Sequence, residues 1–363
     1  MSSEFDIIVI GAGIAGASVA AHLAATHRVA IMEMEERPGY HTTGRSAAAY
    51  EPNYGPVPML ALTRASRRHF DEGCYLTPRE TLFVMPVGQE NDLAALMAVQ
   101  QGMREISVAM AKAKFPLLRD TYAQRAILDP FTADIDVDLL HQNYLKLFRQ
   151  RGGTLACSAP VTALRRNGQW QLQAGGESLR ARIVVDAAGA WGGAVASLAG
   201  KNAIKLQPKR RSVAVIPPPG SWNITEWPLV NDVAVSWYCK PQSGKMLVSP
   251  ADETPVEPHD AFADDMILAE GIDRFQQAVD MEVTRIERSW GGLRSFAPDG
   301  NPVVGYDTAE DGFFWLIGQG GYGIQSAPAL SRLAAALVRN EKPPADIIDE
   351  GLVLADISPR RFG

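Results

Sequence analysis

The chain has 363 residues, a formal charge of −6 and 21% charged residues. A chain of this length exceeds the size at which one hydrophobic core stops growing, so we expect two domains. The acidic balance leaves no basic stripe for nucleic acid, so we expect no nucleic-acid partner. The three cysteines show no metal-ligand spacing and leave an odd thiol, which favours a reducing compartment and predicts no metal site.

The hydropathy pattern predicts no transmembrane segment, because no apolar stretch reaches about eighteen residues without a charge, Gly or Pro. The residues ahead of the first apolar run are few and polar, so we expect no cleavable signal peptide. These features favour a cytoplasmic protein and leave peripheral contact with the inner membrane open.

The N-terminal segment carries the pattern of a dinucleotide-binding unit. An apolar run at residues 7–10 leads into a G-x-G-x-x-G segment at 11–16, and we expect a helix over 17–25. The glycines permit a tight turn and let a pyrophosphate approach the helix N-terminus. The run 29–32 predicts the next parallel strand, and Glu33 would accept hydrogen bonds from the ribose hydroxyls of an adenosine. The predicted contacts are Gly11, Ala12, Gly13, Ile14, Ala15, Gly16, Glu33 and Met34.

Apolar periodicity and turn residues predict the later elements. Helices are expected over 56–75, 91–114 and 139–149, and strands over 81–87, 154–157, 161–165, 170–173 and 183–186. The carboxylates of residues 134–138 would cap the helix that follows them. Residues 206–290 are rich in strands and prolines, which indicates a second domain.

A second glycine cluster, residues 318–323, stands between a predicted strand (313–317) and an apolar helix (327–338). A helix N-terminus with exposed N–H groups stabilises the negative charge of a reduced flavin. An ordinary strand-to-helix turn is the alternative. The residues expected at the flavin are Gly320, Gly321, Tyr322, Gly323 and Ile324.

Five segments, taken in order, resemble the D-amino-acid oxidase superfamily of FAD-dependent amine oxidoreductases: residues 11–16, 39–46, 186–191, 292–302 and 320–323. The resemblance covers essentially the whole chain, and it is greatest to the bacterial D-arginine dehydrogenases, which share segments 207–212 and 358–361. It implies an α/β fold with a Rossmann-type FAD-binding domain of the glutathione-reductase kind and a second α+β substrate domain built on a mixed sheet. The expected division assigns 1–75, 139–205 and 291–363 to the FAD-binding domain and 76–138 and 206–290 to the substrate domain.

The same resemblance implies which residues hold the substrate. Arg294 matches the arginine that anchors the substrate carboxylate, a role suited to a bidentate guanidinium. Arg211 and Tyr238 match supporting positions, and Tyr54 matches a tyrosine on the loop that covers the site. The main-chain carbonyl of Gly321 or Gly323 could accept from the substrate amine. Surface pairing or packing remains the alternative for Arg211, Tyr54 and Tyr238.

The side-chain pocket departs from the D-arginine dehydrogenases. Thr81 stands where those enzymes hold the substrate guanidinium with an acidic residue, and a register slip of one would restore Glu80. Ala49 and Glu51 replace a histidine and a threonine of their active-site loop, and Tyr322 completes the expected pocket. Glu51 either presents a carboxylate from another wall or is a solvated loop residue. Loss of the pairing carboxylate should change the substrate preference.

The remaining cofactor contacts implied by the resemblance are His41, Thr43, Gly44, Arg45, Ser46, Ala47, Ala188, Gly189, Trp191 and Gly292. We expect Gly44, Arg45 and Ser46 to form a turn at a helix N-terminus, where hydrogen-bond donors point toward the flavin or the pyrophosphate. For His41 we expect a hydrogen-bonding role beside non-covalent FAD, with a covalent link as the alternative.

The expected reaction is oxidative deamination of D-amino acids to 2-oxo acids and ammonia, with hydride transfer from Cα to flavin N5 and a specificity unlike strict D-arginine. The electron acceptor is a quinone-like compound or O₂, and the resemblance favours a dehydrogenase. Alternatives on the same scaffold are a sarcosine or glycine oxidase and a 2-hydroxy-acid dehydrogenase. A non-catalytic flavin-binding regulator or assembly factor is the alternative of another class.

Overall fold

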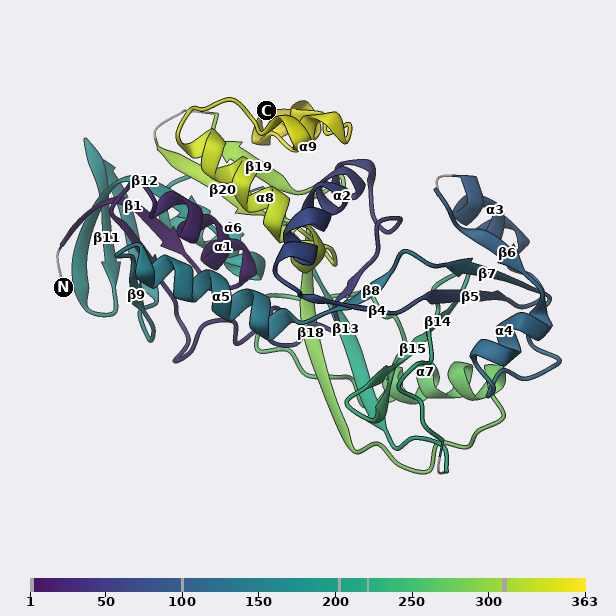
Figure 1. Cartoon of the computed structure of the whole chain (residues 1–363). Helices are drawn as coiled ribbons and strands as arrows, with labels where there is room; N and C mark the ends of the chain where they lie inside the picture. Colours follow the sequence, from purple (N-terminus) through teal and green to yellow (C-terminus); the bar gives the residue numbers. More distant parts are fainter. Residues whose placement is uncertain (1–2, 99–100, 202–203, 221, 309–311) are drawn as a thin grey trace.

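The computed structural model describes residues 3–98, 101–201, 204–220, 222–308 and 312–363. Two large β-sheets, each with its own helices, form two lobes (Figure 1). The long strands β13 (Gln207–Ile216) and β18 (Arg288–Phe296) pair along their whole length and belong to the second sheet. At its end, β18 bridges Gln319 of the first lobe, so the two lobes meet there.

The first sheet has eight strands in the order β10-β11-β12-β1-β2-β9, with β20 on β12 and β19 on β20. Pairs among β1, β2, β9, β12 and β20 are parallel, and β10, β11 and β19 add antiparallel pairs. The strands are β1 (Glu4–Ile10), β2 (Val29–Met32), β9 (Thr154–Ala156), β10 (Val161–Asn167), β11 (Gln169–Ala174), β12 (Glu177–Asp186), β19 (Val303–Tyr306) and β20 (Phe313–Ile317).

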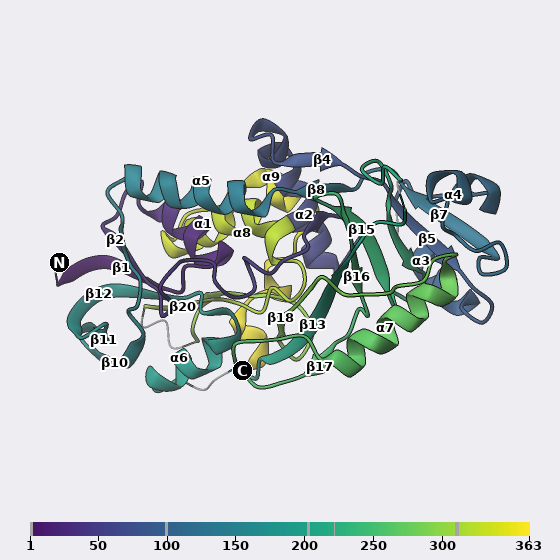
Figure 2. The ribbon, with the colours of Figure 1, turned by 90° about the horizontal axis from the view of Figure 1, so that it is seen from below.

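Successive side chains of β1 point to opposite faces of the sheet, and both faces of a parallel sheet are covered by other elements. The apolar run of β1 is therefore continuous. Ile7 and Val9 pack into one core with α1 (Ile14–Leu23), α5 (Val137–Gln150) and α8 (Gly323–Val338), whereas Ile8 and Ile10 pack into another on the opposite face. Figure 2 shows α1, α5 and α8 on one side of the sheet and α6 (Gly192–Leu198) on the other. Helices α2 (Val57–Glu72) and α9 (Ala345–Asp349) lie beyond α8.

The second sheet has nine strands in the order β17-β13-β16-β15-β14-β5-β7-β6, with β18 on β13. It is mixed, because β14 and β5 pair in parallel and their neighbours pair antiparallel. Its other strands are β5 (Thr81–Met85), β6 (Arg104–Ile106), β7 (Arg125–Asp129), β14 (Leu229–Asp232), β15 (Tyr238–Gln242), β16 (Lys245–Ser249) and β17 (Thr254–Pro255), and α7 (Asp265–Ala278) packs on it. A small third sheet consists of β3 (Ala49–Tyr50), β8 (Ala133–Ile135) and β4 (Leu76–Pro78).

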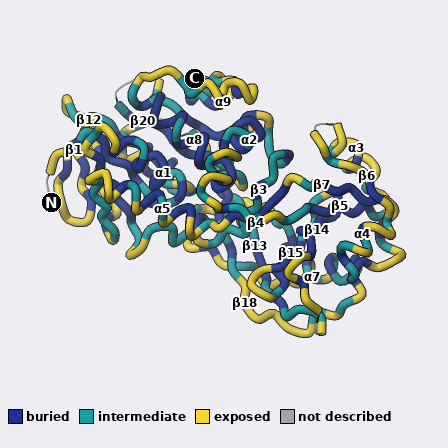
Figure 3. Tube along the Cα trace, viewed as in Figure 1, coloured by how far each residue is buried: buried dark blue, intermediate teal, exposed yellow. Residues whose placement is uncertain are grey.

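The predicted fold class is confirmed: the chain is α/β, with a Rossmann-like sheet and a second, mixed sheet. Buried residues follow both sheets and the helices beside the first one (Figure 3). The expected boundary at residue 291 falls inside β18, because that strand continues to pair with β13 as far as Phe296. The division of the chain into domains stays a prediction.

One predicted helix, 91–114, is wrong. The structure has α3 (Glu90–Ala98), then β6, then α4 (Val108–Lys114), and residues 99–100 lie outside the described part. The Ser107 side chain accepts from the Met110 N–H and so begins a new helix, while β6 completes the sheet edge beside β7. Tertiary pairing thus overrides the helical periodicity in this segment.

Candidate active site

A cavity of about 410 Å³ extends from the N-terminus of α1 to the N-terminus of α8 and on to the second sheet. Its position follows from the fold, since the carboxyl ends of parallel strands form the ligand crevice of α/β sheets. Among the predicted residues, the lining includes Gly11, Gly13, Ile14, Ala15, Glu33, Met34, His41, Thr43, Arg45, Ser46, Ala47, Ala49, Glu51, Tyr54, Ala188, Gly189, Trp191, Arg211, Tyr238, Gly292, Arg294, Gly320, Gly321, Gly323 and Ile324. Five predicted residues are not part of that lining: Ala12, Gly16, Gly44, Thr81 and Tyr322.

At one end of the cavity, backbone groups form a cradle for phosphate. Gly13 is the N-cap of α1 and supplies no side chain, so the helix N-terminus is open toward the cavity. A Cβ at Gly16 would lie 1.9 Å from the Gly11 carbonyl oxygen, so only glycine lets α1 pack this close to β1. Glu33 accepts from the Ala12 N–H at 2.7 Å and from a second backbone N–H at 3.0 Å. These groups fit the adenosine half of a dinucleotide.

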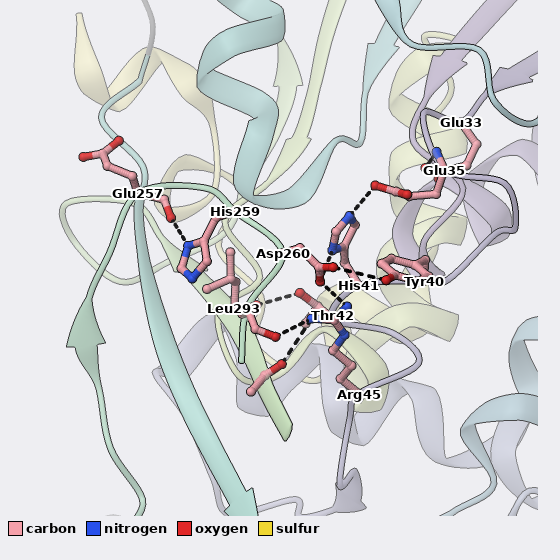
Figure 4. Close-up of polar contacts among 12 residues, drawn as sticks. Glu33, Glu35, Tyr40, His41, Thr42, Arg45, Glu257, His259, Asp260 and Leu293 are labelled. Atoms are coloured by element: carbon pink, nitrogen blue, oxygen red, sulfur yellow. Dashed lines mark hydrogen bonds and ion pairs between the residues drawn. The ribbon is translucent and has the colours of Figure 1, made fainter. Parts of the chain in front are cut away.

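The turn at residues 39–46 is tied to the second lobe (Figure 4). Arg45 donates to the Asp260 carboxylate and to the Ala261 carbonyl, and Thr42 donates to the Leu293 carbonyl at 2.7 Å. The expected helix N-terminus here is wrong, because residues 46–48 are irregular and lead into β3, and α2 begins only at Val57. Arg45 therefore joins the two lobes beside the cavity.

His41 lies in the same network, with both ring nitrogens facing carboxylates. Its Nε2 is 2.8 Å from Glu35 Oε1, and its Nδ1 is 4.0 Å from Asp260 Oδ1 (Figure 4). The centroid of its ring is 4.5 Å from that of Trp191, which also lines the cavity. The surrounding carboxylates hold the imidazole in place.

At the other end of the cavity, two guanidinium groups converge. Arg294 is only 8% exposed; it donates to the Tyr54 hydroxyl at 3.1 Å, and its Nη1 lies 3.1 Å from Glu253 Oε1. Arg211 lies 3.3 Å from the same carboxylate oxygen, with its guanidinium 6.0 Å from the Tyr238 ring centroid. The structure thus brings these four predicted substrate contacts together, and their charge and geometry suit a carboxylate ligand.

Gly321 completes this end of the site from the turn before α8. A Cβ at Gly321 would lie 2.1 Å from Arg294 Nη2, so the glycine leaves room for the guanidinium. Tyr322 lies outside the cavity lining, and its ring packs edge-on against Tyr54 at 4.9 Å between centroids. Tyr322 therefore supports Tyr54 instead of forming a pocket wall.

Of the four predicted side-chain pocket residues, Ala49 and Glu51 line the cavity, and Thr81, like Tyr322, does not. Thr81 is buried, and its hydroxyl donates to the Thr132 hydroxyl at 3.1 Å, while Glu80 pairs with Lys114, so neither register places an acid of this strand in the cavity. Glu51 does line the cavity, and burial, aided by the nearby Asp129 carboxylate and opposed by Lys240, raises its pKa to about 7.

Other lining and supporting residues had no signal in the sequence. Gln325 accepts from the Glu51 N–H at 3.0 Å and donates to the Tyr54 carbonyl at 3.2 Å. Glu253, which faces both arginines, comes from the loop between β16 and β17. Long-range contacts of this kind leave no local pattern that sequence reasoning could detect.

Within the described ranges, no group of three or more His, Cys, Asp or Glu residues could hold a metal ion. In the same part of the chain, no helix has the length and apolar character needed to cross a membrane.

Residues 6–337 match the family model described as FAD dependent oxidoreductase, named DAO. The chain belongs to the DAO family. The cofactor of DAO proteins is FAD, and the α1 and α8 N-termini at the two ends of the cavity fit its pyrophosphate and its flavin. The chain is thus a member of a family of FAD-dependent oxidoreductases.

Several curated proteins are similar to this chain. FAD-dependent oxidoreductase domain-containing protein 1 of Xenopus laevis is 30% identical over 211 residues, or 51% of this chain and 39% of that protein. Mitochondrial dimethylglycine dehydrogenase of Mus musculus is 24% identical over 272 residues, or 69% of this chain and 30% of that protein. The matches therefore span well under half of the length of these relatives.

Two solved structures share the DAO fold across nearly the whole chain. Glycine oxidase from Geobacillus kaustophilus superposes with a TM-score of 0.83 at 21% identity, covering 97% of this chain and 99% of that one. L-proline dehydrogenase from P. horikoshii superposes with a TM-score of 0.85 at 20% identity, covering 100% of this chain and 98% of that one.

Proposed function

We propose that this protein oxidises D-amino acids to imino acids, which hydrolyse to 2-oxo acids and ammonia. The observation that carries the proposal is the convergence of Arg294, Arg211 and Tyr54 on the cavity end where the α8 N-terminus lies. FAD, when bound, supplies the hydride acceptor for such an oxidation. The resemblance to the D-arginine dehydrogenases supports the D configuration.

The residues of this chain would bind and orient the substrate. Arg294 and Arg211 hold the α-carboxylate, and the hydroxyls of Tyr54 and Tyr238 border it. The Gly321 carbonyl accepts a hydrogen bond from the α-amine. Holding both the carboxylate and the amine of the substrate in this way aligns the C–H bond of the α-carbon. This alignment is the main contribution that a protein makes to such a reaction.

The cavity lining contains no acid from strand β5, where Thr81 and Glu80 have other partners, and this supports a specificity different from strict D-arginine. The carboxylates on both sides of His41 support hydrogen bonding, with FAD held non-covalently. We also propose a cytoplasmic dehydrogenase that passes electrons to a quinone-like acceptor, with O₂ as the alternative acceptor.

A substrate panel tests the proposal. Purified holoenzyme would be assayed with matched D- and L-amino acids, sarcosine, glycine and 2-hydroxy acids, once with O₂ and once with an artificial acceptor. We expect kcat/KM to be highest for D-amino acids with the artificial acceptor, with one ammonia released per turnover. Turnover of L-amino acids or N-methylated amines alone would refute the proposed substrate class.

A further inference from the structure

Glu51 lines the same cavity as the carboxylate anchor. Gln325 of α8 bonds to the Glu51 N–H and to the Tyr54 carbonyl, and Tyr54 accepts from Arg294. One set of hydrogen bonds therefore fixes both Glu51 and the anchor. Within the described ranges, the Glu51 side chain forms no hydrogen bond or ion pair with another side chain.

The buried charges around Glu51 do not balance. Asp129 is 2% exposed, and two uncharged amide groups hold its carboxylate at 3.0 and 2.9 Å. Lys240 attracts Glu51, but its ammonium is bonded to Asp134 at 2.7 Å, and Asp134 also binds Arg79. Three carboxyl groups thus share two cations, so one of them has no counterion when all three are ionised. A half-buried carboxylate in this position favours a cationic partner.

The substrate half of the cavity therefore contains groups of both charge signs. Its carboxylate anchor carries the guanidinium groups of Arg294 and Arg211, and a second wall carries Glu51. Phe83, Leu229 and Val235 also line the cavity and offer apolar surface for methylene groups. A substrate that matches the arginines, the apolar surface and Glu51 carries a carboxylate, a chain of methylenes and a positive charge beyond them.

We propose that Glu51 binds a protonated nitrogen at the end of the substrate side chain, which makes basic D-amino acids the preferred substrates. This inference rests on the proposed function. It assigns the recognition of the cation to the turn before Tyr54, and not to the strand β5, where Thr81 and Glu80 face other partners.

The test compares substrates of similar length and shape that differ in the terminal charge. D-lysine is paired with D-norleucine, and D-arginine with D-citrulline, in the holoenzyme and in Glu51→Gln. We expect Glu51→Gln to lower kcat/KM by about tenfold or more for the cationic member of each pair, and by less than about twofold for the neutral member. Glu270→Gln, which removes an exposed charge on α7, is the matched control and should change neither value.

Two results would overturn the inference. An equal loss for both members of a pair would show that Glu51 acts on the α-amine, and no loss would show that it binds no substrate group. The flavin spectrum and the melting temperature of Glu51→Gln should match those of Glu270→Gln, which separates recognition from misfolding. If no D-amino acid reduces the wild-type flavin, the proposed function fails; if only neutral D-amino acids do so, this inference alone fails.

The pH dependence supplies a second readout. Glu51 is neutral below its pKa of about 7 and ionised above it, while a lysine side chain stays protonated up to a pH of about 10. The ratio of kcat/KM for D-lysine to that for D-norleucine should therefore rise as the pH rises through about 7. The other groups that face Glu51 are Asp129, Lys240 and the Gln325 amide. The ratio should be flat across the same range in Glu51→Gln, and a parallel rise there would contradict the assignment.

Discussion

Arg294 illustrates how one residue acquires its role from its surroundings. It lies on β18, is almost fully buried, and is held by Tyr54 and by the Glu253 carboxylate. A buried guanidinium that meets a substrate carboxylate forms a charge-assisted, bidentate contact, which lysine reproduces only as a point charge. Its position therefore decides where the α-carbon of a bound substrate lies.

Arg294→Ala should lower kcat/KM for D-alanine, and the decrease should correspond to a loss of about 2 to 5 kcal/mol of transition-state stabilisation. Ethylamine, which lacks the carboxylate, should be an equally poor substrate for the wild type and for the variant, because the lost interaction is the one with the carboxylate. Arg288→Ala, on the exposed part of the same strand, is the control and should retain wild-type kinetics. If the ratio of kcat/KM for D-alanine to that for ethylamine is the same in Arg294→Ala as in the wild type, this role is refuted.

At the same scale, the pocket shows what the sequence could not predict. The sequence predicted Arg294 and Tyr54 through the resemblance, but placed Thr81 in the pocket. Successive side chains of a strand point to opposite faces, so a motif match does not establish which side chain reaches the cavity. Neither Thr81 nor Glu80 does so, because both have partners elsewhere.

Among the helices and strands, local sequence patterns predicted an element well where its own residues determine its geometry. The strands at 29–32 and 313–317 have the predicted bounds, and glycines begin α1 and α8. The prediction of one helix over 91–114 was wrong because β6 forms by pairing with β7, a contact between residues distant in sequence.

The turn before α8 gives a test at this scale. Gly321→Ala would place a methyl group 2.1 Å from Arg294 Nη2, so the guanidinium must move away from the substrate. We expect kcat/KM to fall by about 10-fold to 100-fold, since a small misplacement of a positioning group has an effect of that size. Gly193→Ala in α6, where the added methyl group meets no atom within 4 Å, is the matched control and should retain activity. Equal kinetics of the two variants would contradict the tight fit of Gly321 against Arg294.

At the scale of the whole molecule, the cavity uses both sheets and several loops. The phosphate cradle and Glu33 come from one continuous segment at the N-terminus, and their pattern was therefore readable in the sequence. The substrate half combines β13, β15, β18, α8 and the turn at 51–54, so only the resemblance could assign its residues. Glu253 and Gln325 were missed because their roles arise from contacts across the fold.

Removal of FAD should lower the stability of the whole chain, since both α1 and α8 would lose a ligand at their N-termini. A ligand present at 100 times its dissociation constant stabilises the folded state by about 2.7 kcal/mol. We expect the melting temperature of the apoprotein to lie about 5 °C or more below that of the holoprotein, and to recover when FAD is added back. Identical melting temperatures would argue against a cofactor that spans the cavity.

We propose that D-amino acids reduce the bound flavin. The most direct measurement is an anaerobic titration of the holoenzyme with a D-amino acid and, separately, with its L-enantiomer, while flavin absorbance and released ammonia are followed. We predict that the D-enantiomer bleaches the flavin with one ammonia formed per flavin reduced, and that the L-enantiomer does not. Bleaching by the L-enantiomer alone, or by neither, would contradict the claim.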